Sequence, residues 1–430
     1  MSKARTRVFY GWWIVLVAAF SLFLGPTSIV AFSFGMFLKP LMQEFHSNRG
    51  SISLAFTLYS TTSSLGLLFA GGLIDRFGPR KVILLFNFLI GLILVSASFC
   101  SGTIWQLYIF YLALGIASFG VAPVSYCHLI SYWFDRYRGL ALGIMMSGLG
   151  AGALVAPSSA HYLIEQFGWR VTFDFSGAAI LSIGMPVLIL FLKEKPELMG
   201  LVPDGDTRAF PRSKAFDVDS GLSFRQALHT STLWLLLCVC ALVAGSTSAC
   251  FVHIASILTD KGFSGQTGAF ATSAVGGGLL VGRVGSGYLL DRFFAPRVAT
   301  LLFVCAAIGM GVLRVGNSLD LAFAAAFCIG LGLGAEVELM AYLASRYFGL
   351  RSFGAVYGLI FASFGLAAGF GAFLMGTGFD ATGSYALPLA LFCIATLTGA
   401  ALMLCLGPYR YERPAVQDRG PELEVLEAEL

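Results

Sequence analysis

The sequence predicts an all-α membrane protein with twelve transmembrane helices in two pseudo-symmetric six-helix bundles. Of the 430 residues, 57% are hydrophobic and 12% are charged, whereas charged residues make up about a quarter of a soluble domain. The apolar runs are 20 to 30 residues long, enough for a helix to cross a hydrocarbon core about 30 Å thick. Barrel strands would instead give segments of about ten alternating residues. A lipid bilayer is therefore the expected surrounding.

The apolar runs divide the chain into four regions. Residues 1–192 hold the first six spans, residues 193–229 form a linker, residues 230–407 hold the other six, and residues 408–430 form a tail. The expected spans are 11–38, 51–74, 81–100, 104–134, 139–163, 170–192, 230–258, 265–290, 297–316, 319–346, 351–378 and 383–407. The first run is too long for the apolar region of a signal peptide, so we interpret it as the first helix.

The polar segments predict the orientation of the chain. The linker is the longest polar stretch, with six basic and six acidic residues, and the polar tail is expected to be solvated. With the N-terminus in the cytoplasm, inside segments hold 21 of the 27 Lys and Arg residues, and one more lies within the membrane. The outside loops hold five, at Lys39, Arg49, Arg170, Lys261 and Arg314. The positive-inside rule thus places both termini in the cytoplasm, in a cell (inner or plasma) membrane.

The two halves repeat one another. A Gly-x3-Asp-Arg sequence ends the second span at Gly71–Arg76 and returns, 216 residues later, at Gly287–Arg292. The first span carries Gly-Pro-Thr-Ser at 25–28 and the seventh carries Gly-Ser-Thr-Ser at 245–248, two places where we expect the helix to bend. Duplicated six-helix units place a binding site between the halves near the middle of the membrane.

Three motifs resemble a known family. The segment 71–81 fits the G-x3-D-R-x-G-x-R-K signature of the major facilitator superfamily, and the twelve-span pattern extends the resemblance over the whole chain. The segments Tyr-Gly-Trp-Trp at 10–13 and 132–143, together with Arg283, resemble the monocarboxylate transporter and oxalate/formate antiporter group. The resemblance implies the major facilitator fold and transport by alternating access, with no cofactor.

Arg283 is the expected substrate-binding residue. It lies eight residues before the polar position Asp291, or roughly 12 Å of helix, so its charge starts well inside the membrane. A cation at that depth is costly and is by default a functional group, and its planar fork of donors suits a carboxylate. Gly278, Gly282 and Ser286 form a smooth face about 100° away, which is suited to packing against another helix.

Differences from related carriers narrow the expected substrate. The internal repeat places Leu67 opposite Arg283, so the cation is not part of a scaffold shared by both halves. Mammalian monocarboxylate transporters resemble this chain but carry an Asp and a Lys where it has Leu279 and Phe32, and oxalate carriers have a Lys near Phe364. One cation in a dry cavity suits one carboxylate, so we expect a small monocarboxylate of the lactate or pyruvate type.

Three residues are candidates for proton coupling. His253 titrates near neutral pH when unperturbed, although an interhelical hydrogen bond is the alternative interpretation. Glu336 and Glu338 point about 200° apart, so both cannot face one cavity. Each is interpreted first as a protonated glutamate bonded to a neighbouring helix, and the functional alternative is that one of them couples protons or pairs with Arg283. A cotransported proton would remove the cost of moving an anion against an inside-negative potential, about 2.3 kcal/mol per 100 mV.

Further polar residues complete the expected site. Single hydroxyls in membrane helices commonly bond to backbone carbonyls, which is the alternative for each proposed donor to the substrate. These donors are Tyr126, Ser125, Ser28, Thr247 and Ser248. Charged residues at the inner helix ends are expected to form a cytoplasmic gate. The gate residues are Asp75, Arg76, Arg136, Arg138, Asp291 and Arg292.

Other functions have less support. Glycine clusters such as the one at 330–334 lie inside apolar runs and predict close helix packing, not nucleotide binding. The sequence has no metal-spaced His or Cys set and no nucleophile with a base, so it predicts neither an enzyme nor a metal site. The net charge of +4 reflects the excess of Lys and Arg in the cytoplasmic segments and does not indicate nucleic-acid binding. A monomer is expected to be sufficient for function. The alternatives are a carboxylate exchanger of the oxalate/formate type, a proton-coupled drug exporter and a non-transporting sensor. The drug exporter is disfavoured because the chain has Ala153 where the antiporter pattern has a proline.

Overall fold

A computed structural model describes residues 9–100, 102–134, 137–203, 221–290, 292–349 and 351–411, apart from the side chains of residues 68, 71, 75, 138 and 139. Nearly all of this chain is helical, because backbone N–H and C=O groups in lipid must bond within their own segment. The N-terminal helices are α1 (Tyr10–Phe23), η1 (Thr27–Ala31), α2 (Phe34–Glu44), α3 (Arg49–Phe77), α4 (Pro79–Val95), η2 (Ser96–Phe99), α5 (Ile104–Ser118), η3 (Phe119–Val121), α6 (Pro123–Trp133), α7 (Arg138–Ala179), η4 (Ile180–Gly184) and α8 (Met185–Phe191).

Short helices η5 (Pro196–Met199) and α9 (Phe224–Leu228) belong to the linker. The C-terminal spans are α10 (Ser231–Asp260), α11 (Gly265–Leu290), α12 (Ala295–Val315), α13 (Leu319–Phe348), α14 (Phe353–Thr382) and α15 (Ala386–Leu404). Within the described ranges, nine helices are long and apolar enough to cross a membrane. One of these, Leu140–Phe191, holds two spans that meet at Gly168, where φ is +83°. With α3 and α11, whose polar residues and glycines lower their hydropathy, the predicted twelve spans are confirmed.

Helix breaks follow the prolines. The first span bends where predicted, because Gly25 and Pro26 end α1 and a π-helical turn, η1, follows. The fourth span has a break that we did not predict, before Pro123, whose ring nitrogen cannot donate to the preceding turn. The bend expected at residues 245–248 is wrong: α10 is continuous there, and the Thr247 hydroxyl bonds to the Val243 carbonyl 2.9 Å away within the same helix.

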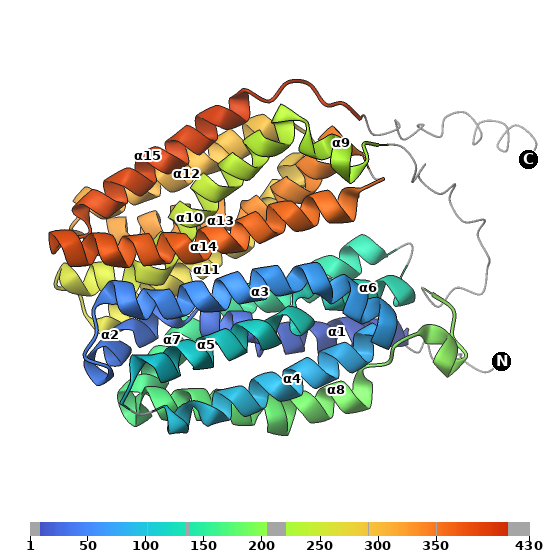
Figure 1. The fold of residues 1–430 in the computed structure, drawn as a ribbon, viewed down its shortest axis with the longest axis horizontal. Helices are drawn as coiled ribbons and strands as arrows, with labels where there is room; N and C mark the ends of the chain where they lie inside the picture. Colours follow the sequence, from blue (N-terminus) through green and yellow to red (C-terminus); the bar gives the residue numbers. More distant parts are fainter. Residues whose placement is uncertain are drawn as a thin grey trace, which may run out of the picture.

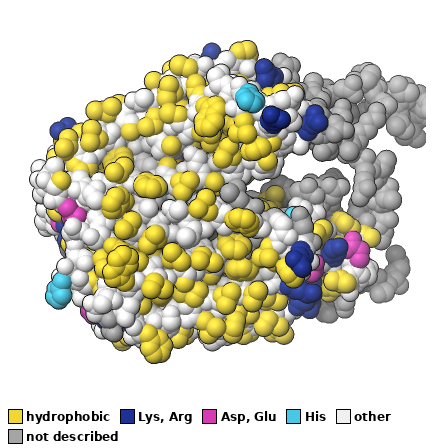
Figure 2. All heavy atoms as spheres, in the orientation of Figure 1, with side chains coloured by type: hydrophobic (Ala, Val, Ile, Leu, Met, Phe, Trp, Pro, Cys, Tyr) yellow, Lys and Arg dark blue, Asp and Glu magenta, His cyan; other side chains and the backbone are white. Residues whose placement is uncertain are grey.

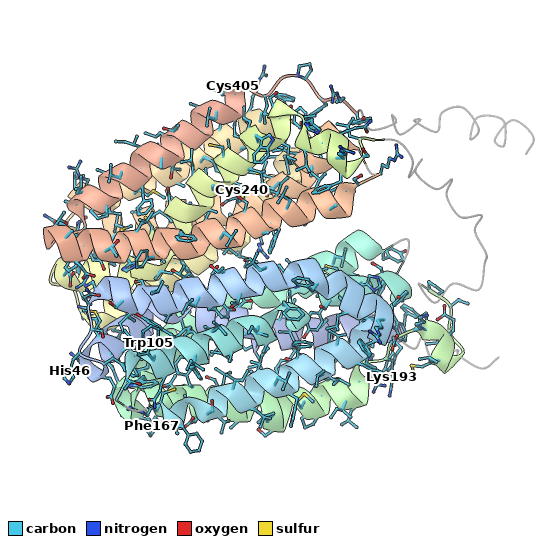
Figure 3. The ribbon with its side chains drawn as sticks, in the orientation of Figure 1. His46, Trp105, Phe167, Lys193, Cys240 and Cys405 are labelled. Atoms are coloured by element: carbon cyan, nitrogen blue, oxygen red, sulfur yellow. The ribbon has the colours of Figure 1, made fainter. Side chains whose placement is uncertain are left out.

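The helices form two bundles that lie side by side (Figure 1). We call α1–α8 the N-bundle and α10–α15 the C-bundle. Both ends of the described chain and the linker lie at one end of the molecule, which we call the terminal end; Figure 3 labels Lys193 there, and His46, Trp105 and Phe167 at the opposite end. The bundles diverge toward the terminal end, where Figure 2 shows a hollow between them. The side surface is largely hydrophobic, with charged groups gathered toward the two ends, as a membrane requires (Figure 2).

Glycine faces allow the C-bundle to pack closely. Gly278 and Gly282 of α11 lie against the backbone of α13, and Gly330 and Gly334 of α13 lie against the backbone of α11. A Cβ atom at any of the four would collide with main-chain atoms of the other helix. Both predicted glycine faces are thus confirmed, and they pack on each other.

The start of the tail is packed against the C-bundle. The Tyr409 hydroxyl accepts a hydrogen bond from the Ala295 N–H at 2.7 Å, and its ring lies against Tyr342, Tyr347 and Phe294. Pro408 and Arg410 are exposed, as a solvated tail requires, whereas the packed ring of Tyr409 departs from that expectation. Residues 412–430 lie outside the described residues.

Candidate functional site

The two bundles contact each other at the end opposite the termini. On one side, α3 packs against α14: Thr57 donates to the Gly369 carbonyl at 2.7 Å and Ser60 donates to the Gly365 carbonyl at 2.6 Å. On the other side, Gly276 of α11 lies against the backbone of α7 at Ala153. These contacts close the space between the bundles from this end, which we call the sealed end.

An arginine holds the bundles together at the sealed end. Arg49 begins α3 and places two guanidinium nitrogens 2.7 and 3.0 Å from the two carboxylate oxygens of Asp260, in α10. The same side chain donates to the Tyr385 hydroxyl at 2.7 Å and covers the ring of Phe379, with its central carbon 3.7 Å from the ring centroid. Asp380 accepts from the backbone N–H of Arg49 at 3.1 Å. We call this group the Arg49 lock.

His253 extends the lock into the C-bundle. It is fully buried, and its Nε2 lies 3.0 Å from the Ala372 carbonyl and 3.2 Å from the Ser53 hydroxyl. A carbonyl only accepts, so Nε2 carries the proton and Nδ1 accepts from the Tyr385 hydroxyl, 2.9 Å away. The Tyr385 oxygen in turn accepts from Arg49. A neutral imidazole therefore fits these contacts, with its one Nε2 proton shared between the Ala372 carbonyl and the Ser53 oxygen. A role for His253 in proton coupling stays a prediction.

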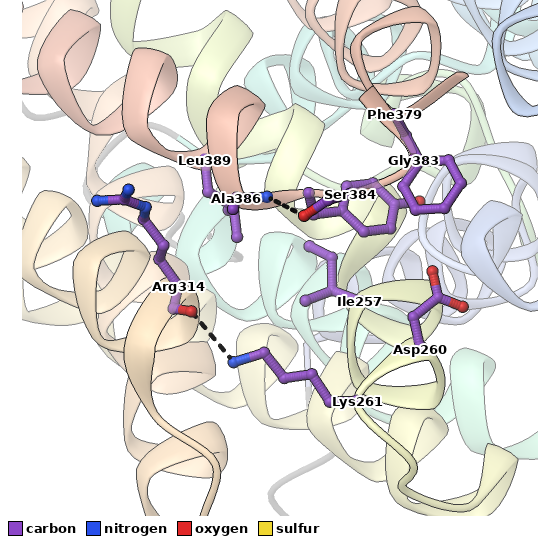
Figure 4. A pocket seen from close by; sticks show the side chains of 10 residues that line it. Ile257, Asp260, Lys261, Arg314, Phe379, Gly383, Ser384, Ala386 and Leu389 are labelled. Atoms are coloured by element: carbon purple, nitrogen blue, oxygen red, sulfur yellow. Dashed lines mark hydrogen bonds between the residues drawn. The ribbon is translucent and has the colours of Figure 1, made fainter. Parts of the chain in front are cut away.

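A surface hollow of about 380 Å³ lies beside the lock (Figure 4). Lys261 forms one side, and its ammonium donates to the Leu313 and Gly316 carbonyls, each 2.6 Å away, at the end of α12. These bonds use the cation to cap a helix C-terminus. Lys261 is therefore occupied structurally and is not free to bind a ligand.

Arg283 lies beyond the sealed half, toward the terminal end. Its Nε is 3.5 Å from an oxygen of Glu338, in α13, and its side chain is 13% exposed. Nε and Nη1 of Arg283 and the second oxygen of Glu338 are buried with no hydrogen-bond partner among the described residues. Of the two glutamates considered as partners of Arg283, Glu338 is the one that lies beside it, and its role in proton coupling stays a prediction. An unfilled guanidinium fork next to a loosely held carboxylate is suited to a second, incoming carboxylate.

Glu336 points away from Arg283 and is fully buried. Its carboxyl group lies near the Cys240 thiol and the backbone of Ala244 on α10, and Figure 3 shows Cys240 within the C-bundle. Neither oxygen has a well-formed hydrogen bond among the described residues.

Tyr357 of α14 lies near the Arg283–Glu338 pair. The Tyr357 hydroxyl lies within electrostatic range of Arg283 and Glu338, and also of Cys127, which belongs to α6 of the N-bundle. Because Tyr357 interacts electrostatically with residues of both bundles, it lies on the side of the C-bundle that faces the N-bundle. The ion pair therefore lies near the side of the C-bundle that faces the N-bundle, the region where the duplicated halves led us to expect a binding site.

Two predicted substrate donors lie inside the N-bundle. Tyr126 is fully buried, shares a 2.6 Å hydrogen bond with Ser21 and accepts one from the Asn87 amide at 3.1 Å. Ser125 is also fully buried, and its hydroxyl has no partner among the described residues. Substrate contact by these residues stays a prediction, and this conformation does not bring Tyr126 to Arg283 with a free hydroxyl.

The other predicted donors are buried as well. Ser28 donates to the Leu22 carbonyl at 3.1 Å, and Thr247 donates to the Val243 carbonyl at 2.9 Å. Ser248 lies beside Thr247 and is 8% exposed. Bonding to backbone carbonyls, the alternative interpretation, describes Ser28 and Thr247 in this conformation.

The predicted cytoplasmic gate lies largely outside the described residues. Arg136, Asp291 and the side chains of Asp75 and Arg138 fall there. Two gate arginines are described, and each lies over a ring of its own segment: Arg76 is 5.2 Å from the Phe77 centroid, and Arg292 is 4.2 Å from that of Tyr288. The gating role stays a prediction.

Sequence reasoning missed the Arg49 lock. Arg49 was interpreted as a loop cation, because it lies at the end of a span and counts toward the topology signal. Its partners Asp260, Asp380 and Tyr385 come from three other helix ends, more than 200 positions away. The sequence held only a weak signal for these contacts. Asp260 and Asp380 are among the few charged residues that the predicted topology places at the outer ends of the spans, near Arg49.

Comparisons with known proteins agree with this architecture. The MFS-type transporter YcxA of Bacillus subtilis is 27% identical over 92% of this chain and 95% of that protein. Monocarboxylate transporter 11 of Mus musculus is 29% identical over 71% of this chain, and the match spans 65% of the transporter's own length. A crystal structure of a bacterial homologue of the human lysosomal transporter Spinster has the same fold, with a TM-score of 0.63 and 18% identity over 94% of each chain. The model of the Major Facilitator Superfamily matches residues 12–372. The chain belongs to the Major Facilitator Superfamily and resembles its monocarboxylate transporters.

Proposed function

We propose that the protein carries a small monocarboxylate, of which lactate and pyruvate are the simplest, across the membrane together with a proton. The observation that carries the proposal is the Arg283–Glu338 pair: the two side chains are 3.5 Å apart, and two buried nitrogens of the cation have no hydrogen-bond partner among the described residues. A substrate carboxylate would take the guanidinium fork with two parallel hydrogen bonds. The resemblance to a named monocarboxylate transporter supports this assignment.

Charge balance favours one carboxylate and one proton. Glu338 neutralises Arg283 when the site is empty. An incoming carboxylate that binds Arg283 leaves Glu338 without its cation, and a carboxyl group in apolar surroundings then binds a proton instead of staying charged. The loaded site would hold one cation, one anion and one neutral acid, so its net charge would match that of the empty site. Glu338 is therefore our coupling residue, and it follows that one proton moves with each substrate.

Alternating access would use the two ends differently. The positive-inside rule assigns the terminal end to the cytoplasm, so the sealed conformation would expose Arg283 to the cytoplasmic side. Release to the opposite side then requires the contacts between α3 and α14 to separate, including the Arg49 lock. One chain supplies both bundles, so we propose that a monomer in the cell membrane suffices.

The test is uptake of labelled lactate and pyruvate into proteoliposomes with and without an inward proton gradient. Arg283→Gln removes the charge and the fork and should reduce uptake roughly 30-fold, since a charged hydrogen-bonded pair contributes about 2 kcal/mol. Arg297→Gln is the matched control, because Arg297 is exposed on α12, outside the site. Glu338→Gln should still exchange substrate across the membrane but should no longer respond to the proton gradient.

Three results would contradict the proposal. Equal uptake by the wild type and Arg283→Gln would remove the binding residue. A proton gradient that still drives uptake in Glu338→Gln would assign coupling elsewhere, with Glu336 and His253 as the next positions. Uptake that depends on internal carboxylate and not on pH would identify an exchanger.

A further inference from the structure

Away from the carboxylate site, basic side chains gather at the terminal end of the N-bundle, with a few acidic groups among them (Figure 2). The Arg80 guanidinium, in the first turn of α4, donates to the Ile189 carbonyl near the end of α8 at 3.1 Å, so these two helix ends lie together. Trp133 donates to the Lys193 carbonyl at 3.1 Å and fixes the segment that follows α8. We call the cations at this corner the basic cluster: Arg80, Lys81, Lys193 and Lys195.

Acidic groups balance the basic cluster only in part. The Glu194 carboxylate lies against Gly78, at the N-terminus of α4, where the helix dipole favours an anion. Glu197 is exposed in the next turn of the chain. Within the described part of the protein, neither acid forms an ion pair with a cation of the cluster. Four cations and two acids give these residues a net charge of +2, which attracts an anion.

An apolar stripe continues from the cluster along α4. Lys81, Leu85, Phe88 and Leu92 recur at intervals of four, three and four residues, so they share one face of the helix, and all four are exposed. The eleven residues from the first to the last of them span roughly 16 Å, about half of a hydrocarbon core 30 Å thick. The stripe therefore has the length of one membrane leaflet, with its charge at the end.

Helix α8 provides a second apolar surface beside the stripe. Ile189 and Leu190 are exposed near its end, and the hydrogen bond from Arg80 joins that end to α4. Both helices lie along the side of the N-bundle that is turned away from the C-bundle (Figure 1). In a membrane this side contacts lipid, not the opening between the bundles. A charged group at the basic cluster with apolar chains along α4 and α8 has the shape of a phospholipid.

We propose that the basic cluster binds the phosphate of an anionic phospholipid in the leaflet at the terminal end, with the acyl chains along α4 and α8. This site is separate from the carboxylate site and does not depend on the identity of the substrate. Lys81 and Lys195 are exposed, so their ammonium groups can reach a phosphate. A zwitterionic headgroup has no net charge for the cluster to attract, and a soluble phosphate would leave both apolar surfaces unused.

The test measures lipid binding to the purified full-length protein in detergent by native mass spectrometry. Phosphatidylglycerol and phosphatidylcholine with the same acyl chains are compared, and we expect the first to bind at least about ten-fold more tightly. The double variant Lys81→Gln/Lys195→Gln removes two exposed charges. It should weaken phosphatidylglycerol binding roughly 25-fold, about five-fold for each cation near a membrane surface, and change phosphatidylcholine binding less than two-fold.

The internal repeat supplies a matched control. Arg297, in the first turn of α12, lies 216 residues after Lys81 at the equivalent position of the C-bundle. Leu301, 64% exposed, follows it by four residues as Leu85, 54% exposed, follows Lys81. Arg297→Gln thus removes an exposed cation beside a similar apolar surface but outside the basic cluster. It should leave the affinity for phosphatidylglycerol within two-fold of the wild type.

Four results would overturn the proposal. They are equal affinities of the wild type for the two lipids, a folded double variant that binds phosphatidylglycerol as the wild type does, an equal loss of affinity in Arg297→Gln, and displacement of the lipid by an equal concentration of glycerol 3-phosphate. The last would assign the cluster to soluble phosphates. Equal melting temperatures show that the double variant folds; if it melts lower, Lys81→Gln alone gives the same test with an expected loss of about five-fold.

Discussion

Replacing Arg49 by methionine should open the sealed end. The change removes a bidentate contact with Asp260, a hydrogen bond to Tyr385 and a cation–π contact with Phe379. It keeps an unbranched apolar stem and leaves the backbone N–H bond to Asp380 in place. The Arg49 side chain is 8% exposed, whereas that of Asp260 is 29% exposed and also lies 3.5 Å from Lys39.

These exposures set the magnitude. A buried pair broken on one side costs about 3–5 kcal/mol, and an exposed pair costs about 0–1 kcal/mol. Asp260 keeps water and a second cation, so we expect a loss of about 2 kcal/mol. The loss applies only to the conformation in which the bundles touch at this end. The equilibrium should therefore shift about 30-fold toward conformations open at the sealed end.

The assay is a distance measurement between the bundles. Spin labels at Gln43→Cys and Asn317→Cys, both exposed at the sealed end and one on each bundle, would be placed in a background without the native cysteines. Arg49→Met should populate a longer distance. Arg170→Met is the matched control, because Arg170 also forms a sealed-end ion pair, 2.6 Å to Glu44, but within the N-bundle. A distribution unchanged by Arg49→Met, or changed equally by Arg170→Met, would refute the role of the lock.

Two further predictions concern the N-bundle. Tyr126→Phe should lower the thermal stability by about 1–2 kcal/mol, because Asn87 and Ser21 lose a buried partner, without changing the KM; a ten-fold higher KM at unchanged melting temperature would instead make Tyr126 a substrate donor. The hydrogen bond from Arg170 holds the pKa of the Glu44 carboxyl below its usual value. The pair therefore stabilises the folded state fully at a pH above the pKa that Glu44 has in the unfolded chain. This stabilisation is lost as the pH falls through the lower pKa that Glu44 has in the folded protein. Glu44 is largely exposed, so Glu44→Gln should flatten the acid limb of a melting-temperature profile by a small amount, and an identical profile would contradict this.

The sequence was sufficient for the fold because lipid imposes strong rules. Span length, the positive-inside count and the repeat each follow from the bilayer, and they predicted the twelve helices and the two bundles. The cation Arg283 was found for the same reason, since a charge inside an apolar run is rare. The break at Gly25 was predictable from the following proline. The bend at Gly245 was not, because no proline follows it and hydroxyls there bond within an intact helix.

Hydroxyl groups were the least predictable part of the site. A Ser or Thr in a membrane helix has an acceptor in its own preceding turn, so its sequence position does not reveal whether it faces a cavity. Ser28 and Thr247 both use backbone carbonyls. Long-range pairs such as Arg49 with Asp260 were invisible for a different reason: charges at helix ends are common, and only the three-dimensional arrangement selects which of them meet.

The pairing of Arg283 with Glu338 shows how packing supplies what a motif lacks. The chain has Leu279 one turn before the arginine, where the resemblance to monocarboxylate transporters led us to look for an acid. Gly334 of α13 lies directly on the backbone of Leu279, and both helices run from the sealed end toward the terminal end. One turn further along each helix brings Glu338 beside Arg283. The glycine contact therefore fixes the register of the ion pair, and an acid on a different helix occupies the place beside the cation that a local motif would otherwise fill.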